Sequence, residues 1–440
     1  MTGCAGTDAP VKALQKLLPS TCIDHVASID VWEDSFRFIQ ANMRPQHFFS
    51  DIDVLDAAGG HACRLHGDPD CANVFEEDID IFVCGPPCKP FSQHNIANFL
   101  RSARAKFKHP QAKPFLKIMR LLHEGTLSPR VIVIENVKGM AKKKKGATST
   151  CLDFILRGSR VENGKVVHYG LEHVTRYAWH VFVMRSDSFH LPHKRERLYI
   201  LGIRRDGDDT DDLMHRVIGM VESQCGVRRP GTLSSVLLPD EEAAKFQKAG
   251  LGGRKPGRAP SQAVLNKFDK FRQSRGFPCR DSKRGQPYSN TLPKSKRKDL
   301  GQRRLELLDI AALSMGSPSS LPQDMVQDLS QNLSRRAWKH GGRITTPTTS
   351  TELFLLNKRR PAVAPELFQA QGWPADELDL SGIRPSLWRV LVGNMMSVPC
   401  VGCILCAVLA VVPMGSDVVK LVQPHDSLRP VSTSSSSKTG

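Results

Sequence analysis

Short β-branched runs alternate with longer helical patterns through the first 205 residues, and this alternation constrains the fold more than any other feature of the sequence. It is typical of an α/β protein in which a mostly parallel sheet carries helices on its faces. The expected strands are residues 25–30, 80–84, 131–135, 181–185 and 198–203. The expected helices are residues 10–18, 32–42 and 112–124. Ligands of such sheets bind beyond the carboxyl ends of the strands, so the residues that follow the strands are candidates for chemistry.

The pattern divides the chain into four parts. Residues 1–205 form the α/β part, whereas residues 206–345 lose the alternation and predict a second, smaller domain or a set of long loops. Residues 346–415 are expected to be ordered again and to belong to the α/β part, and they include an apolar stretch at 398–412. That stretch is too short to span a membrane, and we expect a buried helix there. Residues 416–440 are rich in Ser and are predicted to be disordered.

Positive charge is concentrated in one segment. The chain has 62 Lys and Arg against 44 Asp and Glu, a net charge of +18, but residues 1–141 have a net charge of −1. Residues 245–304 contain 18 basic and three acidic residues, a net of +15. Such a run is either a solvated linker or a surface that binds a polyanion. The basic clusters at 142–145 and 294–298 also resemble nuclear import signals.

The N-terminal residues lack a basic region followed by an apolar stretch, so the sequence predicts no secretory signal and an intracellular protein. The 12 cysteines are scattered through a long chain. In a reducing compartment this predicts free thiols, one of which could be a nucleophile.

Cys88 is the first candidate for that role. It follows the strand at 80–84 within Gly-Pro-Pro-Cys-Lys-Pro-Phe-Ser, where the prolines predict a stiff loop that holds a nucleophile at one angle. The thiolate is the reactive form, and positive charge nearby, such as that of Lys89, would lower the pKa of the thiol. By itself, a Cys after two prolines more often has a structural role.

Three further segments carry polar groups at comparable places. Glu135, in Glu-Asn-Val, ends the strand at 131–135, and a carboxyl group there can share a proton with a ring nitrogen. Arg195 and Arg197 precede the strand at 198–203 and share one face of an extended backbone, so they can bind an oxyanion, a phosphate or a carbonyl. By itself, Glu-Asn-Val carries almost no information, and the arginine segment alone is also compatible with an ordinary charged strand edge. The fourth segment is Gly-Asn-Met-Met-Ser-Val-Pro at 393–399.

Together, in this order and spacing, the four segments resemble the cytosine-C5 DNA methyltransferase family. The resemblance covers residues 1–205 and about 345–412, and the segment 359–374 is similar to the family block that supports target recognition. It implies an α/β fold: a Rossmann-like S-adenosylmethionine-dependent methyltransferase sheet with a smaller inserted target-recognition domain, the latter at 206–345. The implied activity is that of a DNA (cytosine-5-)-methyltransferase that flips its target base out of the duplex.

The resemblance assigns catalytic roles to four residues. Cys88 adds to C6 of cytosine, Glu135 holds the N3 and amino edge, and Arg197, helped by Arg195, contacts O2 and the developing charge. The C5 atom then takes the methyl group of S-adenosylmethionine, the C5 proton is lost and Cys88 is eliminated.

The resemblance also implies how S-adenosylmethionine is bound. Gly6 belongs to the first Gly-rich loop, Asp30 matches the acidic residue on the ribose hydroxyls, and Asp51 with Ile52 matches the pair that reads the adenine. Asn394 closes the pocket near the methionine end. The chain begins where the family's first strand should already have passed, so this central strand, and the aromatic residue that packs against the adenine, are expected to be missing.

Two groups of possible metal ligands do not change this interpretation, and we expect no metal site. The extra segment 53–78 contains four possible ligands at spacings that fit a zinc site poorly: His61, Cys63, His66 and Cys71. Three cysteines recur every three residues in the apolar C-terminal stretch, which predicts core packing: Cys400, Cys403 and Cys406.

Alternatives to DNA methylation stay open. One is the same chemistry on tRNA, although the Cys-Phe-Thr that the RNA-acting branch has shortly after Glu-Asn-Val is absent here. Another is a catalytically impaired remnant that binds nucleic acid through its basic segment. The expected partner is DNA, bound by residues 245–304, with no membrane and a monomeric state. The expected location is the nucleus in a eukaryote and otherwise the cytoplasm.

Overall fold

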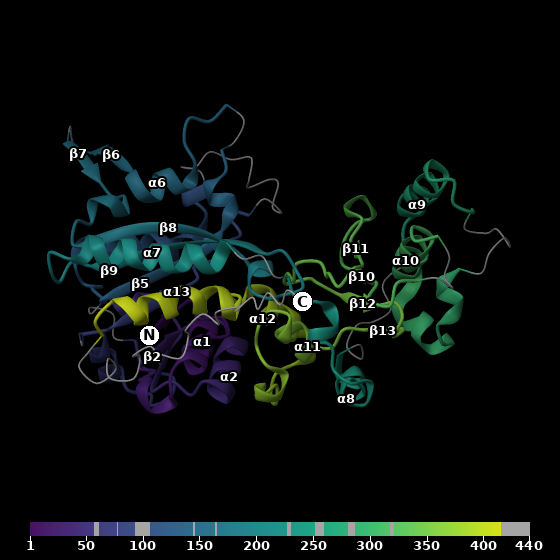
Figure 1. Cartoon of the computed structure of the whole chain (residues 1–440), viewed down its shortest axis with the longest axis horizontal. Coiled ribbons are helices and arrows are strands. Elements are labelled where there is room, and N and C mark those ends of the chain that lie inside the picture. The colour runs from purple at the N-terminus through teal and green to yellow at the C-terminus, as the bar shows by residue number, and fades with distance from the viewer. Residues whose placement is uncertain are drawn as a thin grey trace, which may run out of the picture.

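A computed structural model describes most of the chain, in two parts that lie side by side (Figure 1). The described residues are 1–56, 61–76, 78–92, 106–143, 146–162, 165–226, 230–250, 259–279, 287–316 and 321–414. The tail 416–440, predicted to be disordered, lies outside them. One part is built on a seven-stranded sheet, and the other, on the right of Figure 1, on a four-stranded sheet with α9 and α10.

The seven-stranded sheet confirms the expected α/β class. Its order is β3-β2-β1-β4-β5-β9-β8, and β9 runs in the direction opposite to the other six strands. The strands are β1 (Thr2–Gly3), β2 (Ala27–Ile29), β3 (His47–Phe49), β4 (Ile81–Cys84), β5 (Val131–Val137), β8 (Tyr177–Arg185) and β9 (Glu196–Arg204). Every strand expected from the sequence is present, and β3 is an additional edge strand.

The first strand, expected to be missing, is present as β1 in the middle of this sheet. Thr2 lies opposite Ser28 of β2 and Val83 of β4, so both parallel ladders are formed. The ladder reaches Met1, whose carbonyl accepts a hydrogen bond from the Val83 amide at 3.1 Å. A strand of two residues has no β-branched run long enough to be recognised in the sequence.

Helices cover both faces of the sheet because successive residues of its buried strands point to opposite sides. In β5, Val131 and Val133 pack into one core, and Ile132 and Ile134 into the other. The first core is covered by α1 (Ala9–Leu17), α2 (Glu33–Asn42), α7 (Thr210–Gly226) and α13 (Val398–Val411). The second is covered by α5 (Lys113–Glu124) and α6 (Cys151–Arg157), next to the two-stranded sheet of β6 (Ser159–Glu162) and β7 (Lys165–His168).

The apolar C-terminal stretch forms α13, which lies between α1 and α7 in Figure 1. Cys400 is buried in the core, Cys403 is half-buried and Cys406 is exposed, so the expected core packing holds for the first of the three and not for the last. Among the described helices, none is by itself long and apolar enough to cross a membrane. Only α12 (Pro385–Asn394) and α13 together, bent by 42°, have the length and composition.

The second part is an antiparallel sheet of order β11-β10-β12-β13 with its own apolar core. Its strands are β10 (Val326–Asp328), β11 (Trp338–Lys339), β12 (Leu353–Leu355) and β13 (Arg360–Pro361). Its neighbouring helices are α8 (Asp240–Gly250), α9 (Gln262–Ser274), α10 (Lys294–Leu313) and α11 (Ala364–Gln369). The domain boundaries expected at residues 206 and 345 therefore do not coincide with the two parts of the structure. α7, after residue 206, packs on the larger sheet, and β12 and β13, after residue 345, belong to the smaller one.

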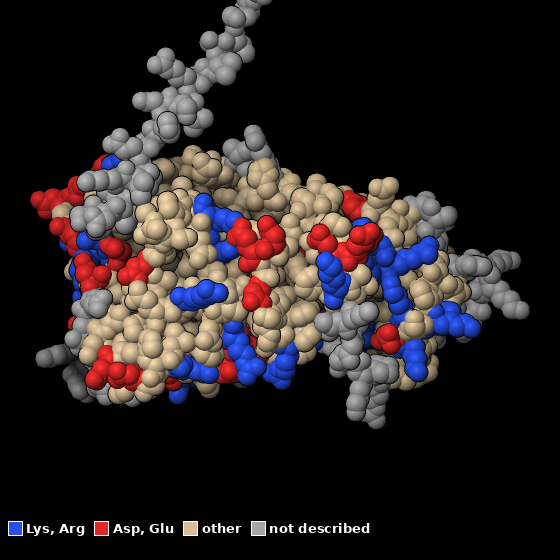
Figure 2. All heavy atoms as spheres, turned by 90° about the horizontal axis from the view of Figure 1, so that it is seen from below, with Lys and Arg blue, Asp and Glu red and all other residues tan. Residues whose placement is uncertain are grey.

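The basic segment lies largely in α9, α10 and the residues between them. Its exposed side chains include Lys267, Lys270, Lys294 and Lys298. Figure 2 shows basic side chains gathered, with acidic ones among them, at the end of the molecule formed by the smaller part. Buried Arg272 instead pairs with Glu306 at 3.0 Å. Residues 251–258 and 280–286, which contribute much of the predicted charge, lie outside the described part of the chain.

Candidate active site at the ends of β4, β5 and β9

The loop that carries Cys88 is fixed at both ends. Where it leaves β4, the Gly85 amide donates to the Gly3 carbonyl at 3.1 Å, which ties the loop to the end of β1. Beyond Cys88, the Phe91 amide donates to the Cys88 carbonyl at 2.9 Å, and the Phe91 ring is fully buried. Two prolines precede Cys88 and restrict the backbone further. The half-buried Cys88 thiol is therefore presented by a stiff loop, as its neighbours predict.

Asn136 connects this loop to the next strand. Its side-chain amide donates to the Pro86 carbonyl at 3.1 Å, and its own oxygen accepts from the Val137 amide at 2.9 Å. The Asn136 side chain is fully buried, so these bonds form away from water. The sequence singled out the Glu-Asn-Val block for its Glu, but the Asn is what holds the Cys88 loop against the end of β5.

Glu135 and Arg197 meet across two adjacent strands. In the antiparallel pair β5 and β9, Val137 lies opposite Arg197, so the end of one strand adjoins the beginning of the other. The Arg197 Nε atom lies 2.9 Å from Glu135 Oε1, and the two side chains are 18% and 11% exposed. The other carboxylate oxygen, Glu135 Oε2, lies beside Gly85, where a Cβ atom would be 3.7 Å from that oxygen and 3.0 Å from the Met396 side chain.

The charges around Cys88 act in opposite directions on its thiol. Burial raises the pKa of Cys88, the positive charges of Arg197 and Arg195 lower it, and Glu135 raises it, with a net rise. Lys89, which the sequence suggested as the nearby positive charge, has an exposed side chain, and the cations that act most on the thiol are the two arginines. Before reaction, Cys88 is therefore mainly a protonated thiol. Formation of the thiolate is favoured by the positive charge of the arginines, or requires the thiol to give its proton to another group.

Arg195 has a different role from Arg197, although the two were expected to act together on one face. Its guanidinium is buried and donates to the carbonyls of Pro347, Gly393 and Met395 at 2.9–3.0 Å. Burial lowers the pKa of Arg195 to about 10. Arg195 therefore holds the returning C-terminal segment beside the start of β9, and its charge also acts on the Cys88 thiol.

At the neighbouring strand ends, Asp30 and Gly6 face each other. The Gly6 amide donates to Asp30 Oδ2 at 2.8 Å, and the Trp32 amide donates to Oδ1 at 2.9 Å. Burial raises the pKa of the Asp30 carboxyl, and these two N–H groups oppose the rise. Gly6 has φ +62°, and a Cβ atom on it would find open space, so the backbone borders a free volume beside the carboxylate.

The other residues expected to bind the cofactor differ from one another in exposure and in the element that carries them. Asp51 is exposed and caps the short helix Ile52–Leu55 by accepting from the Asp53 amide at 3.0 Å, and Ile52 is buried. Asn394 lies at the end of α12 and is exposed. Trp32, which the sequence did not single out, is 41% exposed two residues after Asp30 and offers an aromatic ring at this edge.

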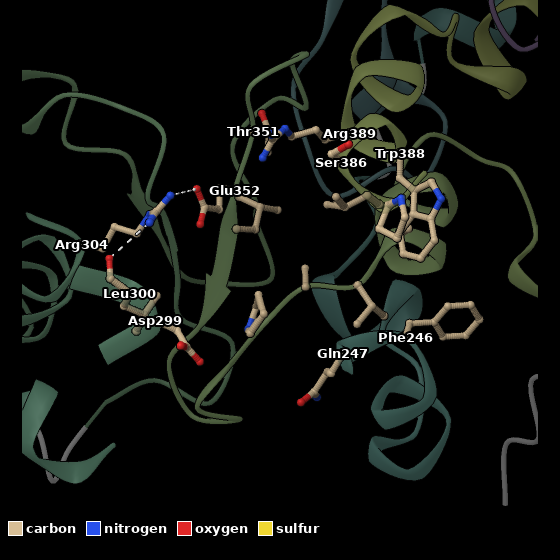
Figure 3. Close-up of a pocket in the computed structure, with 17 residues that line it drawn as sticks. Phe246, Gln247, Asp299, Leu300, Arg304, Thr351, Glu352, Ser386, Trp388 and Arg389 are labelled. Carbon is tan, nitrogen blue, oxygen red and sulfur yellow. Dashed lines mark hydrogen bonds and ion pairs between the residues drawn. The ribbon is translucent and has the colours of Figure 1, made fainter. Parts of the chain in front are cut away.

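A cavity of about 250 Å³ lies elsewhere, between the smaller sheet and α12 (Figure 3). One wall carries the ion pair of Arg304 and Glu352, at 3.1 Å, and the opposite wall carries Phe246 and Trp388. None of the residues predicted to form the site lines it, so this cavity is separate from the Cys88 constellation.

A family model, that of the C-5 cytosine-specific DNA methylase, matches residues 1–242, which is more than half of the chain. The chain belongs to this methylase family. The match begins with β1 and includes Cys88, Glu135 and Arg197. The sequence resemblance to cytosine-C5 methyltransferases is thereby confirmed.

Curated type II methyltransferases are similar to about a third of the chain. The type II methyltransferase M.AquIA of Picosynechococcus sp. is 31% identical over 136 residues, which are 31% of this chain and 48% of that protein. M.BsuFI of Bacillus subtilis is 29% identical over 148 residues, 32% of this chain and 29% of its own length. The chain thus spans less than half of the length of either relative.

Two solved structures are similar over most of the chain. Dnmt2 methyltransferase of S. pombe has a TM-score of 0.45 and 15% identity, with 93% of this chain and 96% of that one covered. A putative DNA modification methyltransferase encoded within an E. coli prophage has a TM-score of 0.49 and 13% identity, with 93% and 98% covered.

Proposed function

We propose that this chain transfers a methyl group from S-adenosylmethionine to C5 of cytosine in DNA. The observation that carries the proposal is the constellation of Cys88, Glu135 and Arg197 at three adjoining strand ends, with the Glu135–Arg197 pair at 2.9 Å. Membership in the C-5 cytosine-specific DNA methylase family supports the reaction class. DNA is favoured as the substrate by that family and by the exposed lysines of α9 and α10.

Cytosine is a poor electrophile until its ring is polarised, which sets the tasks of these residues. The Cys88 thiolate forms a bond to C6 while Glu135 donates a proton to N3, so the electrons of the C5–C6 double bond are released toward C5. Arg197, held by Glu135, stabilises charge that develops on O2. After methylation, a base removes the C5 proton, the sulfur leaves C6 as the thiolate, and N3 returns its proton to Glu135, which regenerates the C5–C6 double bond and both catalytic groups.

The free volume at Gly6 and the carboxylate of Asp30 fit the nucleoside end of S-adenosylmethionine. Asp30 would accept hydrogen bonds from ribose hydroxyls, while Trp32 and Ile52 would offer apolar contact to the adenine. When bound, S-adenosylmethionine supplies the electrophilic methyl group. The exposed side chain of Asn394 would close the methionine end only if α12 approaches the bound cofactor.

The test uses the full chain with radiolabelled S-adenosylmethionine and either duplex DNA or tRNA. We expect label in DNA with the unaltered chain and with Cys279→Ser, an exposed cysteine, and none with Cys88→Ser. Label confined to tRNA would replace DNA by RNA as the substrate. The absence of label in both, with cofactor bound, would indicate a remnant that only binds nucleic acid.

A trapping experiment tests the covalent step separately. In DNA that carries 5-fluorocytosine the C5 substituent cannot leave as a proton, so Cys88 cannot be eliminated after methylation. We expect a denaturant-resistant complex of protein and DNA with the unaltered chain and none with Cys88→Ser. Methyl transfer to ordinary DNA without such a complex would contradict the covalent mechanism.

A further inference from the structure

Four possible metal ligands that are far apart in the sequence meet beside the edge of the seven-stranded sheet. His47, Cys63, His66 and Cys71 each offer one nitrogen or sulfur atom, and these four atoms all lie within 4.8 Å of one another. From the sequence, the fourth possible ligand was His61, and the spacing of that set fitted a zinc site poorly. His47 was not considered because β3, which carries it, was not recognised. The structure thus brings together four possible ligands in a chain whose sequence predicts no metal site.

The geometry is close to that of a tetrahedral zinc site. With Zn–S of about 2.3 Å and Zn–N of about 2.0–2.1 Å, ligand atoms around one ion are separated by roughly 3.3–3.8 Å. Cys71 Sγ lies 3.3 Å from His66 Nδ1, within that range. The rings of His47 and His66 are edge to face, with centroids 5.2 Å apart, so their nitrogens can approach one point from different directions.

A tight turn places the first two ligands of the inserted segment. Cys63 and His66 are separated by two residues, and the Gly67 amide donates to the Cys63 carbonyl at 2.7 Å. Gly67 has φ +73°, a conformation that glycine adopts without strain, and a Cβ atom there would find open space. The Cys63 amide donates to the Asp68 carbonyl at 3.0 Å, which closes the turn before Cys71.

The inserted segment is docked on the sheet next to His47. The Arg64 amide donates to the Phe48 carbonyl at 2.8 Å, and the Arg64 guanidinium contacts both Glu33, at 2.7 Å, and the Phe36 ring, at 3.9 Å. Phe75 packs on Phe49 with ring centroids 5.1 Å apart. These contacts hold the ligands of the insert opposite the ligand on β3.

The chemistry of the four side chains selects the metal. Two thiolates and two neutral imidazoles around Zn²⁺ give a site with no net charge, which suits the fully buried Cys63. Mixed sulfur and nitrogen ligands in tetrahedral arrangement favour zinc over hard cations such as Mg²⁺ or Ca²⁺. With four protein ligands no position is left for water, as in structural zinc sites.

We propose that His47, Cys63, His66 and Cys71 bind one Zn²⁺, which fastens the segment 61–76 to β3. The site is structural: it joins an insert with few buried apolar side chains to β3, where its ligand His47 lies four residues before Asp51. It takes no part in the chemistry of Cys88, and its test does not depend on methyl transfer.

The first measurement is the zinc content of the full chain, purified without a polyhistidine tag under reducing conditions. We expect about one Zn²⁺ per chain. After replacement by Co²⁺, we expect the visible bands of tetrahedral cobalt with thiolate ligands. Cys63→Ser and Cys71→Ser should each lose the zinc and lower the melting temperature, whereas the matched variants Cys22→Ser and Cys279→Ser should keep both unchanged.

The exposed ligand provides a variant with little risk to folding. His66→Ala should reduce the zinc content and make the Cys71 thiol, which is partly exposed, accessible to alkylation without added chelator. A folded, reduced chain that holds no zinc after dialysis against micromolar Zn²⁺ would overturn the proposal. So would full zinc content in both His66→Ala and Cys71→Ser, or a Cys63–Cys71 disulfide in the freshly isolated protein.

Discussion

Glu135 and Arg197 come from neighbouring antiparallel strands and form an ion pair at 2.9 Å where β5 ends and β9 begins. Both groups are mostly shielded from water, so the pair is stronger than one on the surface. The pair fixes the guanidinium next to the Cys88 loop and leaves the other carboxylate oxygen near Gly85. The pair therefore holds together an acid and a cation that both act on the pKa of the Cys88 thiol.

The first prediction concerns the carboxylate. Glu135→Gln keeps the size of the side chain but removes the proton donor and weakens the contact to Arg197. We expect the rate of methyl transfer to fall by at least about 100-fold, the usual scale for general acid catalysis. Single-turnover assays with labelled S-adenosylmethionine measure it. Glu196→Gln, whose carboxylate pairs with Lys138 at 2.9 Å nearer the surface, is the control and should retain most activity.

The second prediction concerns the pKa of the Cys88 thiol, which burial raises and Arg197 lowers. Arg197→Gln removes the opposing positive charge, so the pKa of Cys88 should rise further. The rate of Cys88 alkylation, followed by mass spectrometry from pH 6 to pH 10, should then reach its half-maximum at a higher pH. Lys89→Gln should leave the profile in place; a larger shift with Lys89→Gln would contradict the assignment of the charge.

The sequence predicted the regular part of the fold well. Buried strands such as β5 and amphipathic helices such as α5 have periodic patterns that packing enforces, and both were found at the expected residues. β1 was not recognised because two residues have no period, although neighbouring strands on both sides stabilise them. α7 was assigned to the smaller part because its helical pattern does not indicate which sheet it covers.

For the candidate site, the sequence predicted which strand end carries each residue but not which groups each side chain contacts. Cys88 and Glu135 lie where the parallel strands β4 and β5 end, and Arg197 reaches the same edge because the antiparallel strand β9 begins there. Arg195 and Arg197 look equivalent in the sequence. The carbonyls that accept hydrogen bonds from the Arg195 guanidinium, however, belong to residues more than 150 positions away along the chain. The approach of His47 to Cys63 likewise depends on tertiary structure.

The third prediction follows from those carbonyls. Arg195→Ala leaves the carbonyl oxygens of Pro347, Gly393 and Met395 without their donor in a buried place. We expect the free energy of unfolding to fall by about 3 kcal/mol. Urea denaturation followed by fluorescence measures it. Lys194→Ala, at an exposed neighbouring position, should change stability by less than about 0.5 kcal/mol. Equal losses in the two variants would contradict the anchoring role.

The fourth prediction concerns His193, which is buried where the β8–β9 connection meets the residues after α11. Its Nε2–H donates to the Ala370 carbonyl at 2.9 Å, and burial lowers the pKa of His193 to about 3. The unfolded chain, with an ordinary His pKa near 6.5, binds a proton that the folded chain does not. This contribution to stability is present above pH 6.5 and is lost as pH falls toward 3, by up to about 1.4 kcal/mol per pH unit.

His193→Gln tests this because the glutamine keeps a donor for Ala370 and cannot be protonated. Urea midpoints measured between pH 4.5 and pH 7.5 should fall less steeply for the variant than for the unaltered chain. The control, His190→Asn, replaces an exposed histidine with φ 58° by a residue that tolerates this conformation, and its profile should match the unaltered chain. Identical slopes for all three proteins would exclude His193 as the source.

The last prediction concerns the exposed lysines of α9 and α10. If Lys267, Lys270, Lys294 and Lys298 contact phosphates, each releases condensed counterions, and the logarithm of the binding constant falls linearly with the logarithm of salt concentration. Replacing one helix's pair by Gln should reduce that slope by about two, and all four by about four. Fluorescence anisotropy with a short duplex measures it, and Arg157→Gln, exposed on the larger part, should leave the slope unchanged. An unchanged slope in the quadruple variant would mean that these lysines form a solvated surface and that DNA is held elsewhere.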